Sequence, residues 1–121
     1  MAGHGTPEPL ALVKGTLDAL VLRALAWGPM HGFEITSWLE DRSAGALGVD
    51  DSALYQALHR LEARSQVAAD WGVTPNNRRA RYYRLTEAGR AHLAAETVRW
   101  VRYAEAVTGI LTAPPQAPRP A

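Results

Sequence analysis

The feature that most constrains this sequence is a long helical segment near its C-terminus. Thr86 can cap a helix over residues 87–111, and Glu87 in the first turn suits the helix dipole. A helix of this length spans roughly 37 Å at about 1.5 Å per residue. In a chain of 121 residues too little of the protein is left to cover such a helix, so we expect a second copy to cover it. A seam for pairing recurs at spacings of 4, 3, 4, 3 and 4 residues: Leu93, Thr97, Trp100, Ala104, Val107 and Leu111.

Two short amphipathic helices are predicted in the first part of the chain. The first begins near residues 13–14 and ends by Trp27, because Gly28-Pro29 cannot continue it. The second opens at residues 31–32, and residues 43–49 form a loop after it. Apolar residues at helical spacing predict the inner faces, which are Leu17, Leu20, Val21, Ala24 and Leu25 in the first helix and Phe33, Ile35, Trp38 and Leu39 in the second.

A third helix follows, and its two faces differ in chemistry. Asp50 or Asp51 can cap its N-terminus, and capping is the better role for these acids because they would repel DNA phosphates. The predicted inner face is Leu54, Ala57, Leu58 and Leu61. Three short helices with a polar and basic outer face on the third are typical of a helix-turn-helix core. The candidate DNA contacts on this helix are Ser52, Tyr55, Gln56, His59 and Arg60, although Tyr55 and Arg60 can instead tie the helix to its neighbours.

A β-hairpin is predicted directly after the third helix. Residues 67–71 alternate in polarity, residues 72–77 are rich in turn formers, and residues 78–85 can return as the second strand. The returning strand places Arg81, Tyr83 and Leu85 on one face. A hairpin in this position is a wing, so the sequence predicts a mainly α (α+β) winged helix-turn-helix fold with a long C-terminal dimerisation helix.

The arginines are concentrated in this hairpin. The net charge of the chain is only +1, yet residues 76–84 contain four arginines and no acid. Arginine forks match phosphate geometry, and a hairpin tip can enter the minor groove, where the potential is negative. A solvated basic strand edge is the simpler alternative, since charged residues also protect strand edges from aggregation. The candidate DNA contacts of the hairpin are Asn77, Arg78, Arg79 and Arg81.

Four segments of the chain resemble the PadR family of bacterial transcriptional regulators. They are KGTLDALVLRAL (14–25), GPMHGFEI (28–35), ALYQALHRLEARS (53–65) and NNRRARYYRLTEAGRAHLAAE (76–96), and with the last helix the match spans about residues 10–111. The last two segments are the most specific, since a helix, a wing and Leu-Thr-x-x-Gly before a long helix rarely occur in this order by chance. The short C-terminus resembles the compact subgroup with a single dimerisation helix.

The resemblance implies a homodimeric repressor that binds a pseudo-palindromic operator in double-stranded DNA, and no cofactor is expected. Some family members release DNA when they bind a phenolic acid or an aromatic, drug-like compound. Trp100 is the candidate residue for such an effector pocket, although core packing is the simpler explanation for a large aromatic side chain at this position.

Two positions depart from the family pattern. The family usually has Gly-Ser-Leu-Tyr-Pro at the start of the third helix, whereas this chain has Ser52-Ala53-Leu54-Tyr55-Gln56. Alanine at position 53 removes a phosphate contact, while Gln56 gains a side chain that can read adenine or bridge to phosphate. The family also tends to have glycine where this chain has Ser65, so a left-handed cap is harder to form there and we expect that helix to end differently.

Other classes of function find little support in the sequence. The absence of cysteine excludes disulfides and thiolate zinc sites. The pair His59 and Glu62 has no third ligand, so no metal site is predicted. The sequence shows no catalytic Ser/His/Asp order, Gly-rich phosphate loop or pair of converging carboxylates, so we do not expect an enzyme. Two alternatives to a repressor stay open, namely a winged-helix module that binds another protein and a sensor of aromatic small molecules.

The sequence predicts a cytoplasmic protein with no membrane segment. Residues 10–27 are rich in apolar side chains, but Lys14, Asp18 and Arg23 interrupt them, and the N-terminus lacks the pattern of a signal peptide. The predicted organisation is a disordered tail at 1–9, the winged helix-turn-helix domain at 10–85, the dimerisation helix at 86–112 and a disordered Pro-rich tail at 113–121.

Overall fold

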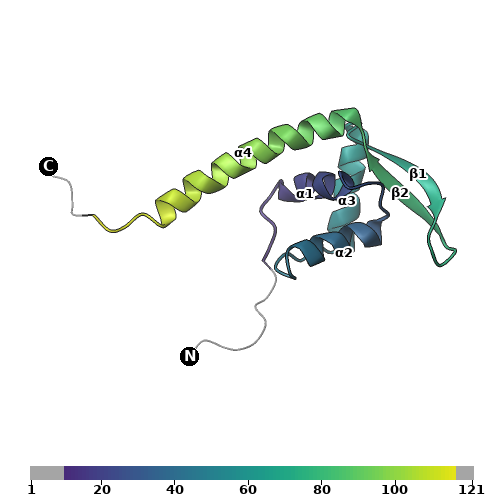
Figure 1. The fold of residues 1–121 in the computed structure, drawn as a ribbon, viewed down its shortest axis with the longest axis horizontal. Coiled ribbons are helices and arrows are strands. Elements are labelled where there is room, and N and C mark those ends of the chain that lie inside the picture. Colours follow the sequence, from purple (N-terminus) through teal and green to yellow (C-terminus); the bar gives the residue numbers. More distant parts are fainter. Residues whose placement is uncertain (1–9, 117–121) are drawn as a thin grey trace, which may run out of the picture.

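A computed structural model describes residues 10–116, and this part of the chain contains four helices and one two-stranded sheet. The three short helices pack together, the hairpin projects from one end of this group, and the last helix passes along the first and continues beyond it (Figure 1). The arrangement confirms the predicted winged helix-turn-helix with a long C-terminal helix. In chain order the elements are α1 (Thr16–Leu25), α2 (Gly32–Arg42), α3 (Asp51–Ala63), β1 (Val67–Val73), β2 (Arg79–Leu85) and α4 (Glu87–Leu111).

The predicted tails fall largely beyond this description. The N-terminal tail at residues 1–9 and the last five residues of the C-terminal tail lie outside the described residues. Residues 113–116 are described, and they are exposed and non-helical. Helix α4 ends at the predicted residue, Leu111.

The hydrophobic core lies between the three short helices, the base of the hairpin and the start of α4. Each helix contributes the face on which its apolar residues recur at intervals of three and four. All four predicted inner residues of α3 are buried, while Leu20 on α1 and Trp38 on α2 are half-buried at its margin. The largest fully buried side chains are Leu22, Ile35, Leu54, Leu58, Leu61 and Val21, and the hairpin and α4 add Val67, Tyr83 and Leu93.

Phe33 does not belong to this core. The sequence placed it on the inner face of α2 with Ile35 and Leu39, but it is 75% exposed whereas those two residues are buried. Residues two apart on a helix point about 200° apart, so Phe33 and Ile35 cannot share one face. Helix α2 turns the Ile35–Leu39 side toward α1 and α3, so the prediction for Phe33 was wrong.

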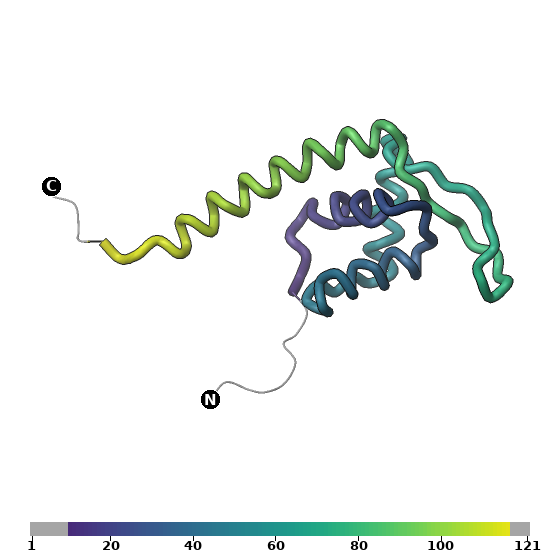
Figure 2. The backbone as a smooth tube through the Cα atoms, in the orientation of Figure 1, coloured from purple at the N-terminus to yellow at the C-terminus, as the bar shows by residue number. Residues whose placement is uncertain are grey.

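The wing is a regular antiparallel hairpin that leaves the end of α3 and returns to the start of α4 (Figure 2). Its register pairs Ala69 with Tyr83 and Trp71 with Arg81, so Arg81, Tyr83 and Leu85 share a face as predicted. Met30, in the connection between α1 and α2, exchanges two backbone hydrogen bonds with Tyr83, at 3.0 and 2.8 Å. The base of the wing is therefore fixed to the helical body.

Helix α3 ends in a left-handed cap at Ser65, where φ is 58°. The backbone N–H of Gln66 donates to the Leu61 carbonyl at 2.9 Å, and that of Ser65 donates to the Glu62 carbonyl at 2.9 Å. These are the two bonds of a Schellman motif, which normally has glycine at its left-handed position. The helix therefore ends in the left-handed cap even with serine, contrary to the expectation that it would end differently.

Replacing Ser65 with glycine is expected to stabilise the protein. A residue with a Cβ atom is strained at positive φ, and glycine removes that strain, so we expect a gain of about 1 kcal/mol in the free energy of unfolding. The midpoint of thermal unfolding, followed by circular dichroism, should rise by about 4–8 °C. Ser65→Ala serves as the control, because alanine keeps the Cβ atom and should give no such rise. A lower melting temperature for Ser65→Gly would contradict this account of the cap.

The corner before α4 explains the glycine of the Leu-Thr-x-x-Gly segment. Thr86 caps α4, because its Oγ1 accepts from the Gly89 N–H at 3.0 Å, and the same hydroxyl donates to the Ser65 carbonyl at 2.7 Å. A Cβ atom at position 89 would fall well inside contact distance of the Gln66 carbonyl oxygen. Gly89 thus allows the first turn of α4 to lie directly on the end of α3.

Replacing Gly89 with alanine is expected to destabilise the protein strongly. The added methyl group meets backbone rather than a flexible side chain, so α4 must shift, at a cost of about 2–4 kcal/mol in the free energy of unfolding. Urea unfolding measures this loss. Gly109→Ala is the matched control in the same helix, because a Cβ atom at Gly109 meets nothing within 4 Å. Equal stability of the two variants would contradict the close packing of α4 on α3 at Gly89.

Candidate nucleic-acid interface

Helix α3 presents its predicted polar face to solvent. Asp50, rather than Asp51, caps the helix, because its Oδ1 accepts from the Ala53 N–H at 2.7 Å. The exposed residues of this face are Ser52, Tyr55, Gln56 and His59. The ring of Tyr55 also reaches the first residue of α2, where a Cβ atom on Gly32 would clash with the phenol. The outer face of α3 is therefore open, and Tyr55 marks its boundary with α2.

Arg60 is held by α1 instead of extending freely from α3. Its Nη2 lies 2.6 Å from Asp18 Oδ1 and its Nε lies 3.2 Å from Asp18 Oδ2, while Arg64 Nη1 approaches the same carboxylate at 3.5 Å. The hydrogen bond from Arg60 to Asp18 raises the pKa of the Arg60 guanidinium above its ordinary value. This geometry matches the alternative role of Arg60, which was to tie the third helix to its neighbours.

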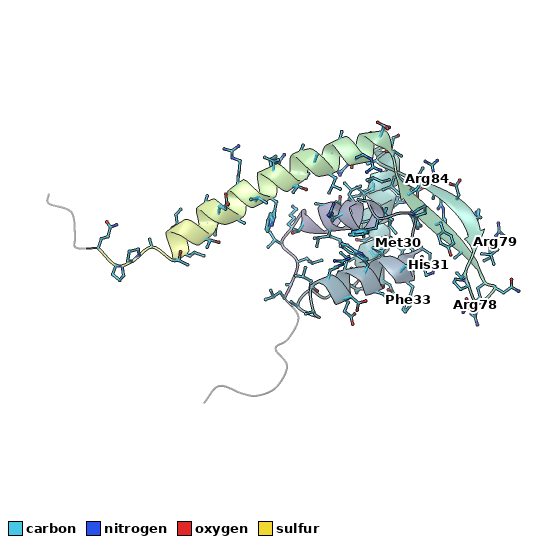
Figure 3. The ribbon with its side chains drawn as sticks, viewed as in Figure 1. Met30, His31, Phe33, Arg78, Arg79 and Arg84 are labelled. Carbon is cyan, nitrogen blue, oxygen red and sulfur yellow. The ribbon has the colours of Figure 1, made fainter. Side chains whose placement is uncertain are left out.

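The arginines of the wing have different surroundings. Arg81 Nη2 lies 2.9 Å from Glu62 Oε2 on α3, so this arginine links the wing to the helix. The Arg79 guanidinium carbon lies 4.2 Å from the centroid of the Trp71 ring, a cation–π geometry. Within residues 10–116, neither Arg78 nor Arg79 forms an ion pair. Figure 3 shows both toward the tip of the wing, whereas Arg84 lies near its base and pairs with Asp70 at 3.3 Å.

Tyr83 lies under the linking arginine. Its ring is buried, with its centroid 5.8 Å from the Arg81 guanidinium carbon. Burial raises the pKa of the Tyr83 phenol, and the positive charge of Arg81 opposes this rise. The phenol is therefore neutral at physiological pH, and the wing rests on an uncharged ring.

Sequence reasoning missed a cleft that continues from the face of α3 toward the wing. The cleft has a volume of about 750 Å³ and lies between the N-terminus of α2 and the inner face of the hairpin. Phe33, Tyr55, Trp71, Arg79 and Arg81 are among its lining residues. The alternation of the hairpin placed Trp71 on one side of its strand, but nothing in the sequence indicated that Phe33 faces the same space.

Comparison with known proteins identifies this arrangement. A model of the transcriptional regulator PadR-like family matches residues 21–95, which is more than half of the chain. The chain belongs to the PadR-like family. Members of this family are DNA-binding regulators and not enzymes, so the protein is a DNA-binding transcriptional regulator.

The chain is similar to several individual proteins. The similarity to a PadR family regulator from Eggerthella lenta covers 84% of this chain and 86% of that protein, with 27% identity and a TM-score of 0.70. A PadR-like regulator from Bacillus cereus has the same fold, with a TM-score of 0.72 at 19% identity over 84% of this chain and 96% of its own. Uncharacterized protein X of Lysinibacillus sphaericus is 26% identical over 96 residues, which is 79% of this chain and 88% of that protein.

The predicted pairing seam of this PadR-like chain has two different parts. Leu93 is buried in the core of its own chain, so it is not available to a partner. Farther along α4, Ala104 and Val107 are half-buried and Leu111 is 78% exposed. The part of the seam that a second copy can reach therefore begins at Thr97.

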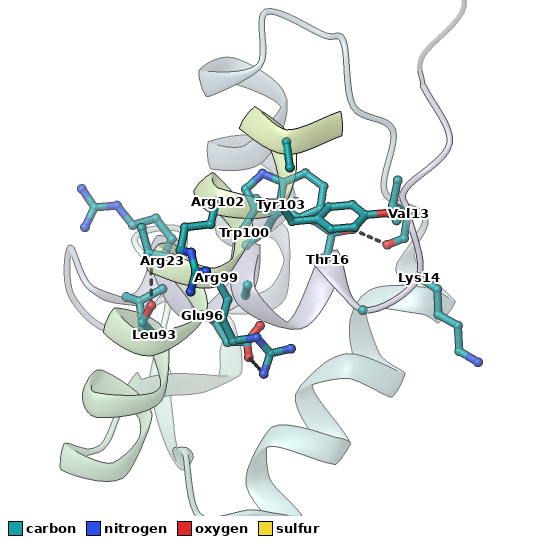
Figure 4. Close-up of a pocket in the computed structure, with 15 residues that line it drawn as sticks. Val13, Lys14, Thr16, Arg23, Leu93, Glu96, Arg99, Trp100, Arg102 and Tyr103 are labelled. Atoms are coloured by element: carbon teal, nitrogen blue, oxygen red, sulfur yellow. Dashed lines mark hydrogen bonds and ion pairs between the residues drawn. The ribbon is translucent and has the colours of Figure 1, made fainter. Parts of the chain in front are cut away.

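A second cavity of the PadR-like chain lies between α1 and α4. It is a groove of about 1080 Å³, and Trp100 and Tyr103 line it with their ring centroids 5.9 Å apart (Figure 4). Trp100 is 43% exposed, so the core packing that we considered the simpler explanation does not hold within one chain. Arg23, Arg99 and Arg102 also line this groove.

Among residues 10–116, no three histidine, aspartate or glutamate side chains gather in a way that could hold a metal ion. None of the described helices has the length and apolar composition needed to cross a bilayer.

Proposed function

We propose that this regulator is a cytoplasmic, homodimeric repressor that binds a pseudo-palindromic operator. Each copy lays residues 52–64 in a major groove and its hairpin, residues 72–81, along the neighbouring minor groove. The two half-sites are then related by the two-fold axis of the dimer and lie about one helical turn of DNA apart. In this proposal residues 10–85 bind DNA and residues 86–112 join the two copies.

The observation that carries the proposal is the position of Arg78 and Arg79 beside the open face of α3. Both guanidinium groups lie on a hairpin that is fixed to α3 through the Arg81–Glu62 ion pair, so helix and wing meet DNA as one unit. Phosphate contacts supply most of the binding free energy, and base contacts supply sequence preference.

The candidate DNA-contacting residues therefore divide into four roles. Gln56 and His59 read bases from α3, where a glutamine amide can pair with adenine. Arg78 and Arg79 neutralise phosphates. Arg60 and Arg81 position the helix and the wing through Asp18 and Glu62. Ser52, Tyr55 and Asn77 complete the DNA-facing surface as neutral hydrogen-bonding groups.

The second copy is proposed from the apolar surface of α4. The C-terminal part of α4 extends past the other elements of its own chain (Figure 1), and this helix exposes Val101, Tyr103, Ile110 and Leu111. These residues lie on or beside the predicted seam, and large exposed apolar patches mark protein interfaces. The same stripe on a second copy of α4 can cover it, because a two-fold axis brings the same residues together from both copies.

We also propose that an aromatic compound releases the repressor by binding in the groove beside Trp100. The rings of Trp100 and Tyr103 suit a flat apolar ligand. Arg99 pairs with Glu96 of the same groove at 3.2 Å, and the remaining arginines of the groove, Arg23 and Arg102, suit an acid. Quenching of tryptophan fluorescence by aromatic acids, together with release of bound DNA, is the expected result. Quenching with no effect on DNA binding would instead favour a sensor of small molecules.

Selection of bound fragments from the host genome tests the proposed function. The purified protein is mixed with sheared genomic DNA at moderate salt, and the fragments it retains are sequenced. We expect one enriched motif with two inverted half-sites, upstream of a small number of genes. No enrichment, combined with a stable monomer in light scattering, would contradict the proposal and favour a module that binds another protein.

A further inference from the structure

The cleft between α2 and the wing combines exposed aromatic rings with positive charge. Phe33 is 75% exposed, Trp71 is 62% exposed, and Tyr55 is exposed beside them. Arg78, Arg79 and Arg81 line the same cleft, and none of its described lining residues is acidic. A ligand that fits this surface has both negative groups and apolar faces.

Phe33 is the least explained residue of this cleft. Its nearest aromatic neighbour is His31, whose ring centroid lies 6.5 Å away in a stacked orientation, and most of the Phe33 ring stays in solvent. A single exposed apolar side chain is ordinary on a protein surface. Here, however, the exposed ring shares one concavity with two further exposed aromatic rings and three guanidinium groups, which points to a bound partner.

The charges around the cleft favour an anion along the wing side. Arg81 is neutralised by Glu62, which leaves Arg78 and Arg79 for a ligand, and Trp71 holds the Arg79 guanidinium over its ring. On the α2 side Glu34 follows Phe33 in the chain, and its Oε1 accepts from the His31 N–H at 3.1 Å as part of a capping box. The carboxylate of Glu34 therefore serves the helix terminus and is not among the lining groups.

The cleft is continuous with the open face of α3. Tyr55 belongs to both surfaces, since it lies on the exposed side of α3 and also lines the cleft. Figure 3 shows Phe33 at the end of α2 that faces the wing and Arg78 at the tip of the hairpin. A DNA strand that leaves the face of α3 toward the wing must pass over this cleft.

We propose that one sugar–phosphate strand of the bound duplex lies in the cleft, with a deoxyribose packed against Phe33. The backbone of DNA alternates phosphates, which suit Arg78 and Arg79, with apolar sugar faces, which suit an aromatic ring. Trp71 is a positioning residue that orients Arg79. The inference rests on the proposed DNA contact of α3 and the wing, and it adds Phe33 as a contact that carries no charge.

Phe33→Ala is the test, with a mixed-sequence duplex of about 30 base pairs as the probe. A mixed-sequence probe is sufficient because a sugar contact does not depend on base sequence. Since the substitution removes the apolar contact of the ring, we expect the affinity to fall about fivefold to tenfold. The slope of log K against log salt should stay unchanged, since no charge is removed. Phe33→Tyr keeps the ring and should bind within about twofold of the wild type. Trp27→Ala is the matched control, because it removes an exposed ring outside the cleft.

Three outcomes would overturn the inference. The first is a Phe33→Ala variant that binds like the wild type while Arg78→Ala and Arg79→Ala lose affinity, which would leave the proposed function standing and assign the cleft to a ligand other than DNA. The second is an equal loss for Phe33→Tyr and Phe33→Ala, which would show that the ring makes no contact. The third is an unchanged affinity for the Phe33 and arginine variants alike, which would contradict the proposed function itself. Thermal unfolding checks that each variant is folded.

Discussion

Replacing both Arg78 and Arg79 with alanine is expected to weaken binding to every duplex by about 10- to 100-fold at moderate salt. Both guanidinium groups lie toward the tip of the wing, and neither has an ion-pair partner among residues 10–116. Each phosphate contact releases about 0.9 counterion, so the slope of log K against log salt should fall by about 2. Fluorescence anisotropy over a series of salt concentrations measures both quantities, and operator and mixed-sequence duplexes should lose affinity alike.

Arg84→Ala is the matched control for this pair of substitutions. Arg84 lies on the same strand, but its side chain is on the opposite face of the hairpin from Arg79 and Arg81, and it pairs with Asp70. Its removal lowers the net charge by the same amount as either single variant. We therefore expect little change in affinity or salt slope. A loss equal to that of Arg79→Ala would show that overall charge, and not the position of the wing arginines, governs binding.

Replacing Ala104 and Val107 with aspartate is expected to separate the proposed dimer into monomers. The two positions lie in the middle of the seam on α4, where two copies would bring four carboxylates together in a water-excluded interface. Light scattering should then report a mass of 13.1 kDa in place of twice that value. Binding to a two-half-site duplex should weaken by about 100-fold or more, because the two half-sites no longer share one binding event.

Val98→Asp is the control for the separation of the dimer. Val98 is an exposed apolar residue of the same helix, but it lies outside the seam. This variant should remain a dimer with unchanged affinity for DNA. Monomers from both variants would indicate a general loss of α4, which far-ultraviolet circular dichroism detects. A dimer that persists after Ala104→Asp and Val107→Asp are combined would place the pairing surface elsewhere.

The parts of the fold that the sequence predicted are those fixed by local signals. Helix α4 has the predicted bounds because Thr86 offers a hydroxyl cap directly before a continuous helical segment. The prediction of the inner face of α3 was correct because its apolar residues recur at intervals of three and four residues without interruption. The face shared by Arg81, Tyr83 and Leu85 follows from the two-residue period of a strand, which leaves no freedom once the strand is recognised.

The parts that failed have two different causes. Phe33 was assigned to the inner face of α2 because it is apolar, although it lies about 200° around the helix from Ile35, and the helical period already separates the two residues. Ser65 adopts a left-handed conformation in a Schellman motif, and its carbonyl also accepts a hydrogen bond from Thr86, which is 21 residues away. Tertiary contacts of this kind outweigh the intrinsic preference of a single residue.

The same limit applies to the charged residues of the candidate interface. The sequence showed which arginines lie on α3 and on the wing, but not which of them have acidic partners. Asp18 and Arg60 are 42 residues apart, and Glu62 and Arg81 are 19 apart, so neither pair is visible as a motif. The proposed division into DNA-contacting and positioning arginines therefore required the three-dimensional structure.

The most direct test of the account is the stoichiometry of the protein on DNA. Equilibrium sedimentation of the protein with an operator duplex, at low salt, measures the mass of the complex. We predict two chains per duplex, which is twice 13.1 kDa of protein in addition to the mass of the DNA. One chain per duplex, or no complex even in dilute salt, would contradict the claim that two copies paired through α4 place their α3 helices and wings on adjacent turns of DNA.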